Sequence, residues 1–218
     1  FFSQTSKSMK IHFKNLADKI KDKYLKKNNS FILELGSNDG ILLQNFVGFN
    51  CEHLGVEPSK NVADEAAKYE VKSIVKYFSS DVADEIINEY GKADVVTSAN
   101  VMCHIPKIND VALGISKLLK DDGVLIFEDP YLLSMIEKTS YDQVYDEHVF
   151  LFSILSVNSI FNRFGLYLFD VEPLNTHGGS MRYYLSKNNN NSKSQNLKMF
   201  EEKEKKAKLH SIETYIKF

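Results

Sequence analysis

The sequence is poor in three features, each of which would point to a particular class of protein. It has only two cysteines, Cys51 and Cys103, too few for a disulfide framework and without the paired spacing of a zinc site. Its net charge of −2 gives no electrostatic footprint for nucleic acid or a membrane surface. No apolar run approaches the length of a membrane span. We therefore expect a reduced, cytoplasmic protein without nucleic-acid or membrane partners.

The length and the polar C-terminal part predict how the chain is organised. At 218 residues it can bury one sizeable α/β core with an appendage. We expect this core at residues 1–187, followed by a polar linker and a charged helix at residues 188–218. Such a polar helix at the chain end suggests the lead into a further domain. Because the chain begins with Phe1 rather than Met, we expect it to be a piece of a longer protein.

The most informative segment is residues 31–40, an apolar run that ends in the turn Gly36-Ser-Asn-Asp-Gly40. A helix is expected to begin at residues 41–46, and a second apolar run ends in Glu57. A strand, a glycine turn, a helix and an acid at the next strand tip are typical of a nucleoside-binding βαβ unit. Glycine lets the backbone approach a ligand, and the acid can accept both ribose hydroxyls. A purely structural turn is the alternative interpretation.

The turn also favours one kind of nucleoside ligand. Asn38 stands where a dinucleotide fingerprint has its middle glycine, which argues against a pyrophosphate passing over the turn. The turn suits a ligand with an amino acid in that place, as in S-adenosylmethionine. Phe78 is a candidate wall for the adenine, or simply a core residue. The candidate cofactor-binding residues are Glu34, Gly36, Ser37, Asn38, Gly40, Glu57, Phe78 and Asn100.

Strands and helices alternate along most of the sequence. Apolar spacing predicts helices at residues 9–24, 62–67, 82–87, 108–119, 154–164 and 197–218. Besides the strand that ends in Glu57, strands are expected at residues 31–35, 71–78, 93–98 and 124–128, with a turn at 121–123. Residues 166–171 and 181–185 are expected to form an antiparallel hairpin. This order predicts an α/β fold with helices on both faces of a mostly parallel seven-stranded sheet. One reversed strand, 181–185, beside 124–128 is the architecture of Rossmann-like class I methyltransferases.

Several polar side chains follow the ends of predicted strands, where open α/β sheets bind ligands. They include His104 after the fourth strand, the segment Tyr145-Asp-Glu-His148 after the fifth, and His177-Gly-Gly179 at the last hairpin. A positioned histidine can take a proton near neutral pH. Each feature also has a plain structural interpretation: a helix cap for His104, an exposed loop with a local ion pair, and a simple turn.

These motifs together resemble those of S-adenosylmethionine-dependent sugar C-methyltransferases. The resemblance extends from about residue 3 to residue 187. It rests on the following segments in this order: LGSNDG at 35–40, GVEP at 55–58, NVMCHIP at 100–106, YDEHVFLFS at 145–153 and HGGSMR at 177–182. In that family an N-terminal zinc domain and a C-terminal Rossmann-like domain flank the core, and neither is recognised here. Asp146 and residues 149–152 depart from the family pattern, which affects the expected substrate more than the reaction class.

The resemblance implies a substrate and a mechanism. The substrate would be a nucleotide-linked 4-keto-deoxysugar, methylated at the carbon beside its ketone through an enolate. By match to the family motif, His148 is the candidate base, oriented by Glu147, while Tyr145 and His104 stabilise the enolate oxygen. His177, Gly178 and Gly179 would bind the sugar, and no metal is required.

Two other functions remain open from the sequence. One is an O- or N-methyltransferase for another small molecule, in which the tyrosine-glutamate-histidine segment would be idle. The other is a cofactor-binding module without catalytic activity. The oligomeric state, the nucleotide and the sugar are not predicted.

Overall fold

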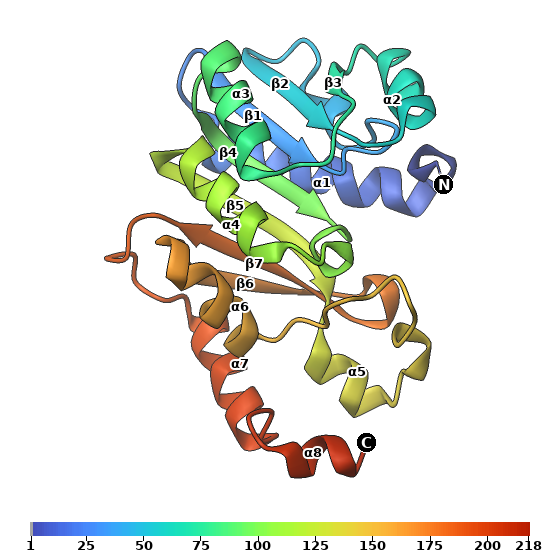
Figure 1. Cartoon of the computed structure of the whole chain (residues 1–218), viewed down its shortest axis with the longest axis vertical. Helices are drawn as coiled ribbons and strands as arrows, with labels where there is room; N and C mark the ends of the chain where they lie inside the picture. The colour runs from blue at the N-terminus through green and yellow to red at the C-terminus, as the bar shows by residue number, and fades with distance from the viewer. Residues whose placement is uncertain (1) are drawn as a thin grey trace. The chain divides into compact units, whose positions relative to one another are not determined.

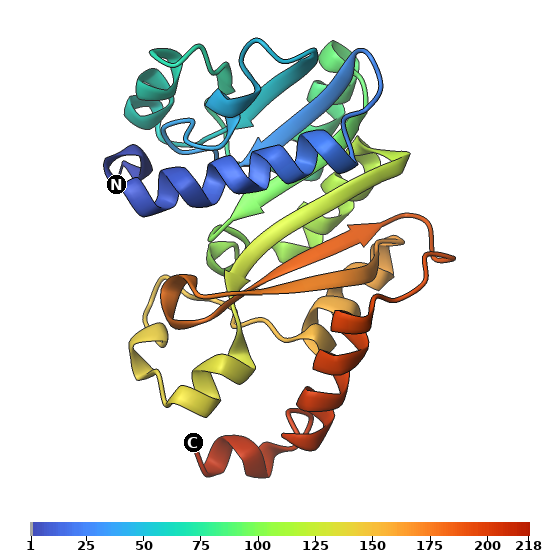
Figure 2. The same cartoon turned by 180° about the vertical axis from the view of Figure 1, so that it is seen from behind.

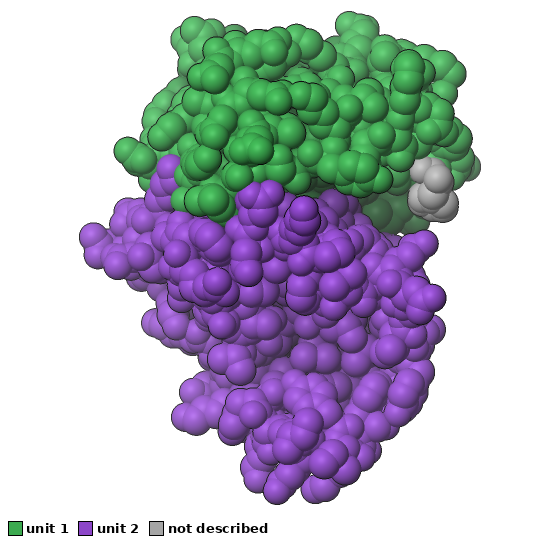
Figure 3. All heavy atoms as spheres, viewed as in Figure 1, with its two compact units in different colours: residues 1–98, 113–125 green, residues 99–112, 126–218 purple. Residues whose placement is uncertain are grey.

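A computed structural model describes residues 2–218; Phe1, the first residue of the predicted core, lies outside the described residues. Seven strands form one sheet in the order β3-β2-β1-β4-β5-β7-β6. The chain divides into two compact units, residues 1–98 with 113–125 and residues 99–112 with 126–218 (Figure 3). No helix in the described part of the chain is long and apolar enough to cross a membrane.

The first unit holds the parallel part of the sheet. Helix α1 lies on the face of β1 and β2 that Figure 2 shows in front, and α3 lies on the opposite face, in front in Figure 1. β1 is buried along its whole length and pairs in parallel with β2 and β4. The α-helices and strands that lie wholly in this unit are α1 (Lys7–Lys23), β1 (Ser30–Leu35), β2 (Cys51–Val56), α2 (Lys60–Ala67), β3 (Ser73–Ile74) and α3 (Ser80–Tyr90). Strand β4 (Ala93–Ala99), helix α4 (Ile108–Leu118) and strand β5 (Leu119–Pro130) each have residues in both units.

The second unit is built on an antiparallel hairpin. β6 (Tyr167–Leu174) pairs with β7 (Ser180–Ser186) from Tyr167 opposite Ser186 to Leu174 opposite Ser180. The sheet order places β7 beside β5, as the sequence predicts. Four helices complete the unit: α5 (Leu132–Lys138), α6 (Ile154–Phe161), α7 (Gln195–Lys206) and α8 (Ile212–Ile216).

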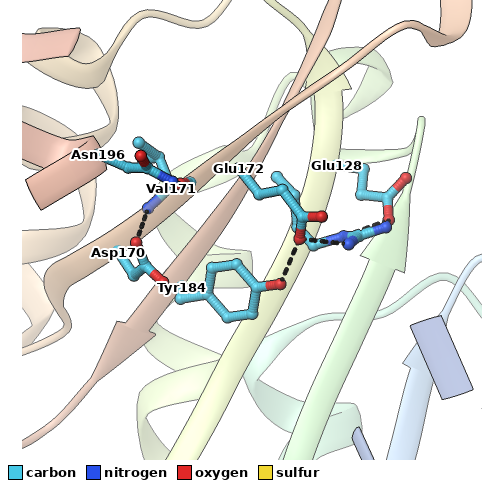
Figure 4. Close-up of polar contacts among 7 residues, drawn as sticks. Glu128, Asp170, Val171, Glu172, Tyr184 and Asn196 are labelled. Atoms are coloured by element: carbon cyan, nitrogen blue, oxygen red, sulfur yellow. Dashed lines mark hydrogen bonds and ion pairs between the residues drawn. The ribbon is translucent and has the colours of Figure 1, made fainter. Parts of the chain in front are cut away.

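A buried ion cluster ties the three strands of this unit together (Figure 4). Arg182 of β7, with 3% of its side chain exposed, donates from Nε to Glu128 of β5 over 2.7 Å. Its Nη1 donates to Glu172 of β6 over 2.7 Å, and Glu172 also accepts from the Tyr184 hydroxyl over 3.0 Å. The neighbouring carboxylates raise the pKa of the Arg182 guanidinium above its usual range, against the opposing effect of burial. Arg182 therefore joins β7 both to β6 and to β5, the strand that precedes it by 54 residues at Glu128.

Two expected elements are shorter than predicted. Residues 41–46 form only a 3-10 helix, Leu43–Phe46, because the Asn45 amide donates to the carbonyls of Ile41 and Leu42 and takes these acceptors from the helix ladder. The predicted strand at 71–78 is reduced to Ser73–Ile74, which pairs only with β2 at the edge of the sheet. Beyond it Tyr77 is 83% exposed, so the apolar run there is not a core signal.

Two other expectations are wrong in detail. Residues 121–123 are not a turn but part of β5, and Asp122 forms an exposed ion pair with Lys27. The single helix expected at 197–218 is divided into α7 and α8. Lys208 has a left-handed φ of 53°, which ends the first of them. Helix α5 has no counterpart in the sequence-based prediction.

Candidate active site

The glycine turn follows β1 and contains three left-handed residues. Gly36, Asn38 and Gly40 have φ values of 65°, 49° and 76°, a conformation that glycine and asparagine tolerate best. The neighbouring Gly55 of β2 is equally constrained, because a Cβ atom there would lie 2.2 Å from Ser37 Oγ. The local sequence therefore dictates a tight turn pressed against the second strand.

Glu57 links the tip of β2 to this turn. Glu57 is buried, with 7% of the residue exposed. Its carboxylate accepts hydrogen bonds from the main-chain N–H of Asn38 over 3.1 Å and from that of Ser59 over 2.9 Å. These bonds use one acceptor site on each oxygen and leave a second lone pair on each. Glu57 can thus hold the turn and still accept ribose hydroxyls.

The residues of the turn fit the expected S-adenosylmethionine. Ser37 Oγ and Asp39 Oδ1 are buried polar atoms with no hydrogen-bond partner among residues 2–218, so the turn retains unused polar capacity. Burial raises the pKa of Asp39, whose Oδ2 accepts from the N–H of Gln4 over 2.8 Å. The sequence-based prediction missed Gln4, because a main-chain N–H donor can come from any residue type.

The other candidate cofactor-binding residues, Glu34, Phe78 and Asn100, lie in three different segments of the chain and contact different neighbours. Glu34 is buried within β1, and Phe78 is half-buried against α4, where a Cβ on Gly114 would lie 3.0 Å from its ring. This contact supports the core interpretation of Phe78; its role as an adenine wall stays a prediction. Asn100 belongs to the second unit, has a φ of 55°, and donates its N–H to the Glu128 carbonyl over 2.7 Å.

In the second unit the structure brings His148 and Tyr145 together. His148 Nδ1 lies 2.8 Å from the main-chain carbonyl of Gln143. A carbonyl oxygen carries no proton, so Nδ1 donates and the neutral ring keeps its lone pair on Nε2. The Tyr145 hydroxyl lies 3.0 Å from Nε2 and donates to it. Burial raises the pKa of Tyr145, which keeps its hydroxyl protonated.

His104 lies beside this pair, with its ring centroid 5.0 Å from that of His148. Its Nδ1 donates to the main-chain carbonyl of Glu147 over 2.7 Å, so its lone pair is also on Nε2. His104 is in the 3-10 turn Met102–His104, and α4 begins only at Ile108, so the helix-cap interpretation does not apply.

Cys103 anchors the loop that carries His148. Its carbonyl accepts from the N–H groups of Val149 and Phe150 over 2.9 and 3.1 Å, and its own N–H lies 3.4 Å from Asp129 Oδ1. Asp129 is fully buried, which raises its pKa to about 7. Burial also raises the pKa of the Cys103 thiol, and the nearby Asp129 carboxylate adds to this rise. The sequence-based prediction missed both residues, although Cys103 adjoins His104.

The role expected of Glu147 differs from the observed contacts. Its side chain is exposed, and the group on His148 Nδ1 is the Gln143 carbonyl rather than the Glu147 carboxylate. Glu147 contributes through its main chain, by holding His104. A main-chain acceptor can come from any residue type, so the sequence could not reveal Gln143.

The histidine-glycine-glycine segment lies between β6 and β7. His177 is exposed with a φ of 49°, and the carbonyl of Gly178 accepts from Lys138 Nζ. Gly179 has a φ of 133°, and a Cβ atom there would lie 2.8 Å from the Cβ of Ser134 in α5. Gly179 thus has a structural reason to be glycine, and its sugar-binding role stays a prediction.

Comparison with known proteins identifies the family of this chain. The sequence matches the family described as a methyltransferase domain over residues 9–171, and the one described as a C-methyltransferase C-terminal domain over residues 175–218. The chain belongs to the methyltransferase-domain family. This membership confirms S-adenosylmethionine as the cofactor.

One curated relative and two solved structures are informative. The chain is 32% identical over 170 residues to the C-methyltransferase NovU of Streptomyces niveus, a match that covers 78% of this chain and 40% of NovU. A magnesium protoporphyrin IX methyltransferase from Synechocystis with bound SAM is 12% identical, with a TM-score of 0.60 over 81% of this chain and 78% of that one. An S-adenosylmethionine-dependent methyltransferase from Clostridium acetobutylicum is 15% identical, with a TM-score of 0.62 over 80% and 91%. The predicted class I methyltransferase fold is confirmed.

Proposed function

We propose that this chain is the catalytic core of an S-adenosylmethionine-dependent C-methyltransferase. Its substrate is a nucleotide-linked 4-keto-deoxysugar, methylated at the carbon beside the ketone. The observation that carries the proposal is the pair formed by His148 and Tyr145, in which an imidazole lone pair and a hydroxyl donor lie 3.0 Å apart. The 32% identity to a protein named as a C-methyltransferase supports the same reaction class.

A C-methyltransferase needs a base of this kind. S-adenosylmethionine supplies an electrophilic methyl group, but a carbon beside a ketone becomes a nucleophile only after it loses a proton. His148 Nε2 takes that proton, and the Gln143 carbonyl on Nδ1 stabilises the imidazolium that forms. An O- or N-methyltransferase would have less use for this arrangement, because its acceptor atom already carries a lone pair.

The enolate oxygen also needs a hydrogen-bond donor. The Tyr145 hydroxyl can rotate from His148 Nε2 to the ketone oxygen when the substrate is present. His104 is the weaker candidate, because its Nδ1 is bound to the Glu147 carbonyl and its Nε2 could donate only as an imidazolium. We therefore assign the donor role first to Tyr145, and keep His177, Gly178 and Gly179 as proposed contacts of the sugar.

The domain organisation is also a proposal. The matched C-terminal family begins at residue 175, yet β7 (Ser180–Ser186) completes the hairpin with β6. We therefore place the end of the core at residue 187, and residues 188–218 lead from it into the rest of a longer protein. The match to less than half of NovU supports this arrangement.

Solvent deuterium exchange tests the function, because it isolates deprotonation from methyl transfer. A thymidine- or guanosine-diphosphate 4-keto-deoxysugar is incubated with the protein in D₂O, and exchange at the carbon beside the ketone is followed by NMR. His148→Ala should lower the exchange rate by about two to four orders of magnitude, the usual contribution of a general base.

The matched control is His210→Ala, which removes an exposed histidine beyond α7 and should leave the rate unchanged. Exchange that persists undiminished in His148→Ala would reassign the base. Absence of exchange in the wild-type protein with every keto sugar, together with cofactor binding, would favour a binding module instead.

A further inference from the structure

We propose that Cys103, His104 and His148 form a binding site for one Zn²⁺ ion, and that an ion bound there inhibits deprotonation of the substrate. The inhibitory part rests on the proposed function of His148, whereas the site itself does not. Nothing in the sequence pattern indicates such a site, because its ligands come from two segments that meet only in the folded chain.

The three side chains lie close to the geometry that zinc requires. One donor atom from each, the Cys103 sulfur and a ring nitrogen from His104 and His148, lies within 4.8 Å of the other two. In tetrahedral zinc sites, bond lengths of about 2.0–2.3 Å place the donor atoms about 3.3–3.8 Å apart. A side-chain movement of about 1 Å therefore closes the site around the ion.

The surroundings of the two histidines are those of zinc ligands. In such sites the second ring nitrogen donates to a carbonyl or carboxylate, which fixes the tautomer and the ring orientation. His104 donates from Nδ1 to the Glu147 carbonyl over 2.7 Å, and His148 donates from Nδ1 to the Gln143 carbonyl over 2.8 Å. Both rings therefore keep their lone pairs on Nε2, as coordination demands.

The proton and charge changes on binding are simple. The Cys103 S–H bond breaks, a sulfur–zinc bond forms, and the proton leaves to solvent. On His148, the ion takes the Nε2 lone pair, and the Tyr145 hydroxyl leaves that nitrogen. The fourth zinc position remains for water, because residues 2–218 offer three ligands in this group.

Zinc and the substrate proton compete for the same electron pair. While His148 Nε2 is coordinated, it cannot accept a proton from carbon, so the ion blocks the first step of the reaction. The expected effect is loss of exchange with retained cofactor binding, since the glycine-turn residues belong to the other unit and are not ligands.

Cobalt provides the test of the site, because a cobalt–thiolate bond gives a near-ultraviolet charge-transfer band. The chelator-treated chain should show this band with one equivalent of Co²⁺, and Zn²⁺ should abolish it. Cys103→Ala and Cys103→Ser should lose the band. Cys51→Ala, which removes the other cysteine of the chain, a residue of the first unit, should keep the band. His104→Ala should weaken binding at least about tenfold. Absence of the band, or its survival in Cys103→Ala, would overturn the site.

Deuterium exchange tests the inhibition. One equivalent of Zn²⁺ should suppress exchange in the wild-type protein, and excess chelator should restore it. In Cys103→Ala, one equivalent of Zn²⁺ should lower the exchange rate much less than it does in the wild-type protein, each rate being compared with that of the same protein without zinc. Exchange that continues in the zinc-loaded protein, or that requires zinc, would refute the inhibitory role. A zinc-free wild-type protein without any exchange would refute the proposed function and the inhibition together, while the cobalt band still decides the site.

Discussion

Removal of the Arg182 charge should be among the most destabilising single changes in the second unit. Arg182→Met keeps much of the side-chain volume but leaves Glu128, which is 2% exposed, without its guanidinium partner. Breaking a buried pair by removing one partner costs about 3–5 kcal/mol, because the remaining charge is buried without compensation. We expect the free energy of unfolding to fall by that amount.

The double variant Arg182→Met with Glu128→Leu separates charge burial from packing. Replacing both partners by apolar groups of similar size is often neutral or stabilising. The double variant should therefore recover most of the loss, and the two single changes should be strongly non-additive. Urea unfolding followed by circular dichroism measures all four members of the cycle.

The matched control is Arg163→Met, which removes an exposed arginine 5.7 Å from the Phe164 ring. It should cost no more than about 1 kcal/mol, the usual worth of an exposed cation–π contact. A loss below about 1 kcal/mol for Arg182→Met, or a double variant no more stable than additivity predicts, would refute this account of the cluster.

Three further predictions concern single residues. Glu57→Ala should weaken S-adenosylhomocysteine binding by about 1.5–3 kcal/mol in calorimetry, while the exposed Glu52→Ala should not; tighter binding of NAD than of S-adenosylhomocysteine would contradict the assignment. Gly179→Ala should lower stability by about 1–3 kcal/mol in thermal melts, more than Gly165→Ala, where a Cβ meets open space; equal losses would contradict the close contact. Burial raises the pKa of Asp129 to about 7 from 3.8, so the folded state holds a proton that the unfolded chain releases. The free energy of unfolding should therefore fall by up to about 4 kcal/mol from about pH 4 to 7 in the wild type, and Asp129→Asn should lack this fall in urea titrations.

The parts of the fold that the sequence predicts well are those with strong apolar periodicity. β1 is buried along its whole length, so its sequence is apolar except for Ser30 and Glu34, and the short loop before β7 requires a hairpin. The errors occur where side chains override the pattern. The Asn45 amide binds main-chain carbonyls that a helix at 41–46 would use, and residues 121–123 continue β5 although two acids and a glycine are typical of a turn.

The candidate site is predictable only in part for a similar reason. The residues after strand ends, such as Glu57 and His148, carry a side-chain signature that a sequence motif records. The partners that fix them are main-chain groups, as at Gln143, or residues that meet only after folding, as with Cys103 and Asp129. Such partners leave no trace in residue spacing.

The use of main-chain carbonyls to hold both imidazoles has a consequence for how this enzyme can diversify. The side chains of Gln143 and Glu147 can change without moving the carbonyls that fix His148 and His104. Natural or designed variants can therefore reshape this loop for a different substrate while His148 and His104 keep their tautomers and orientations. A saturation library at Gln143 and Glu147 would sample substrate preference with the positions of both imidazoles unchanged.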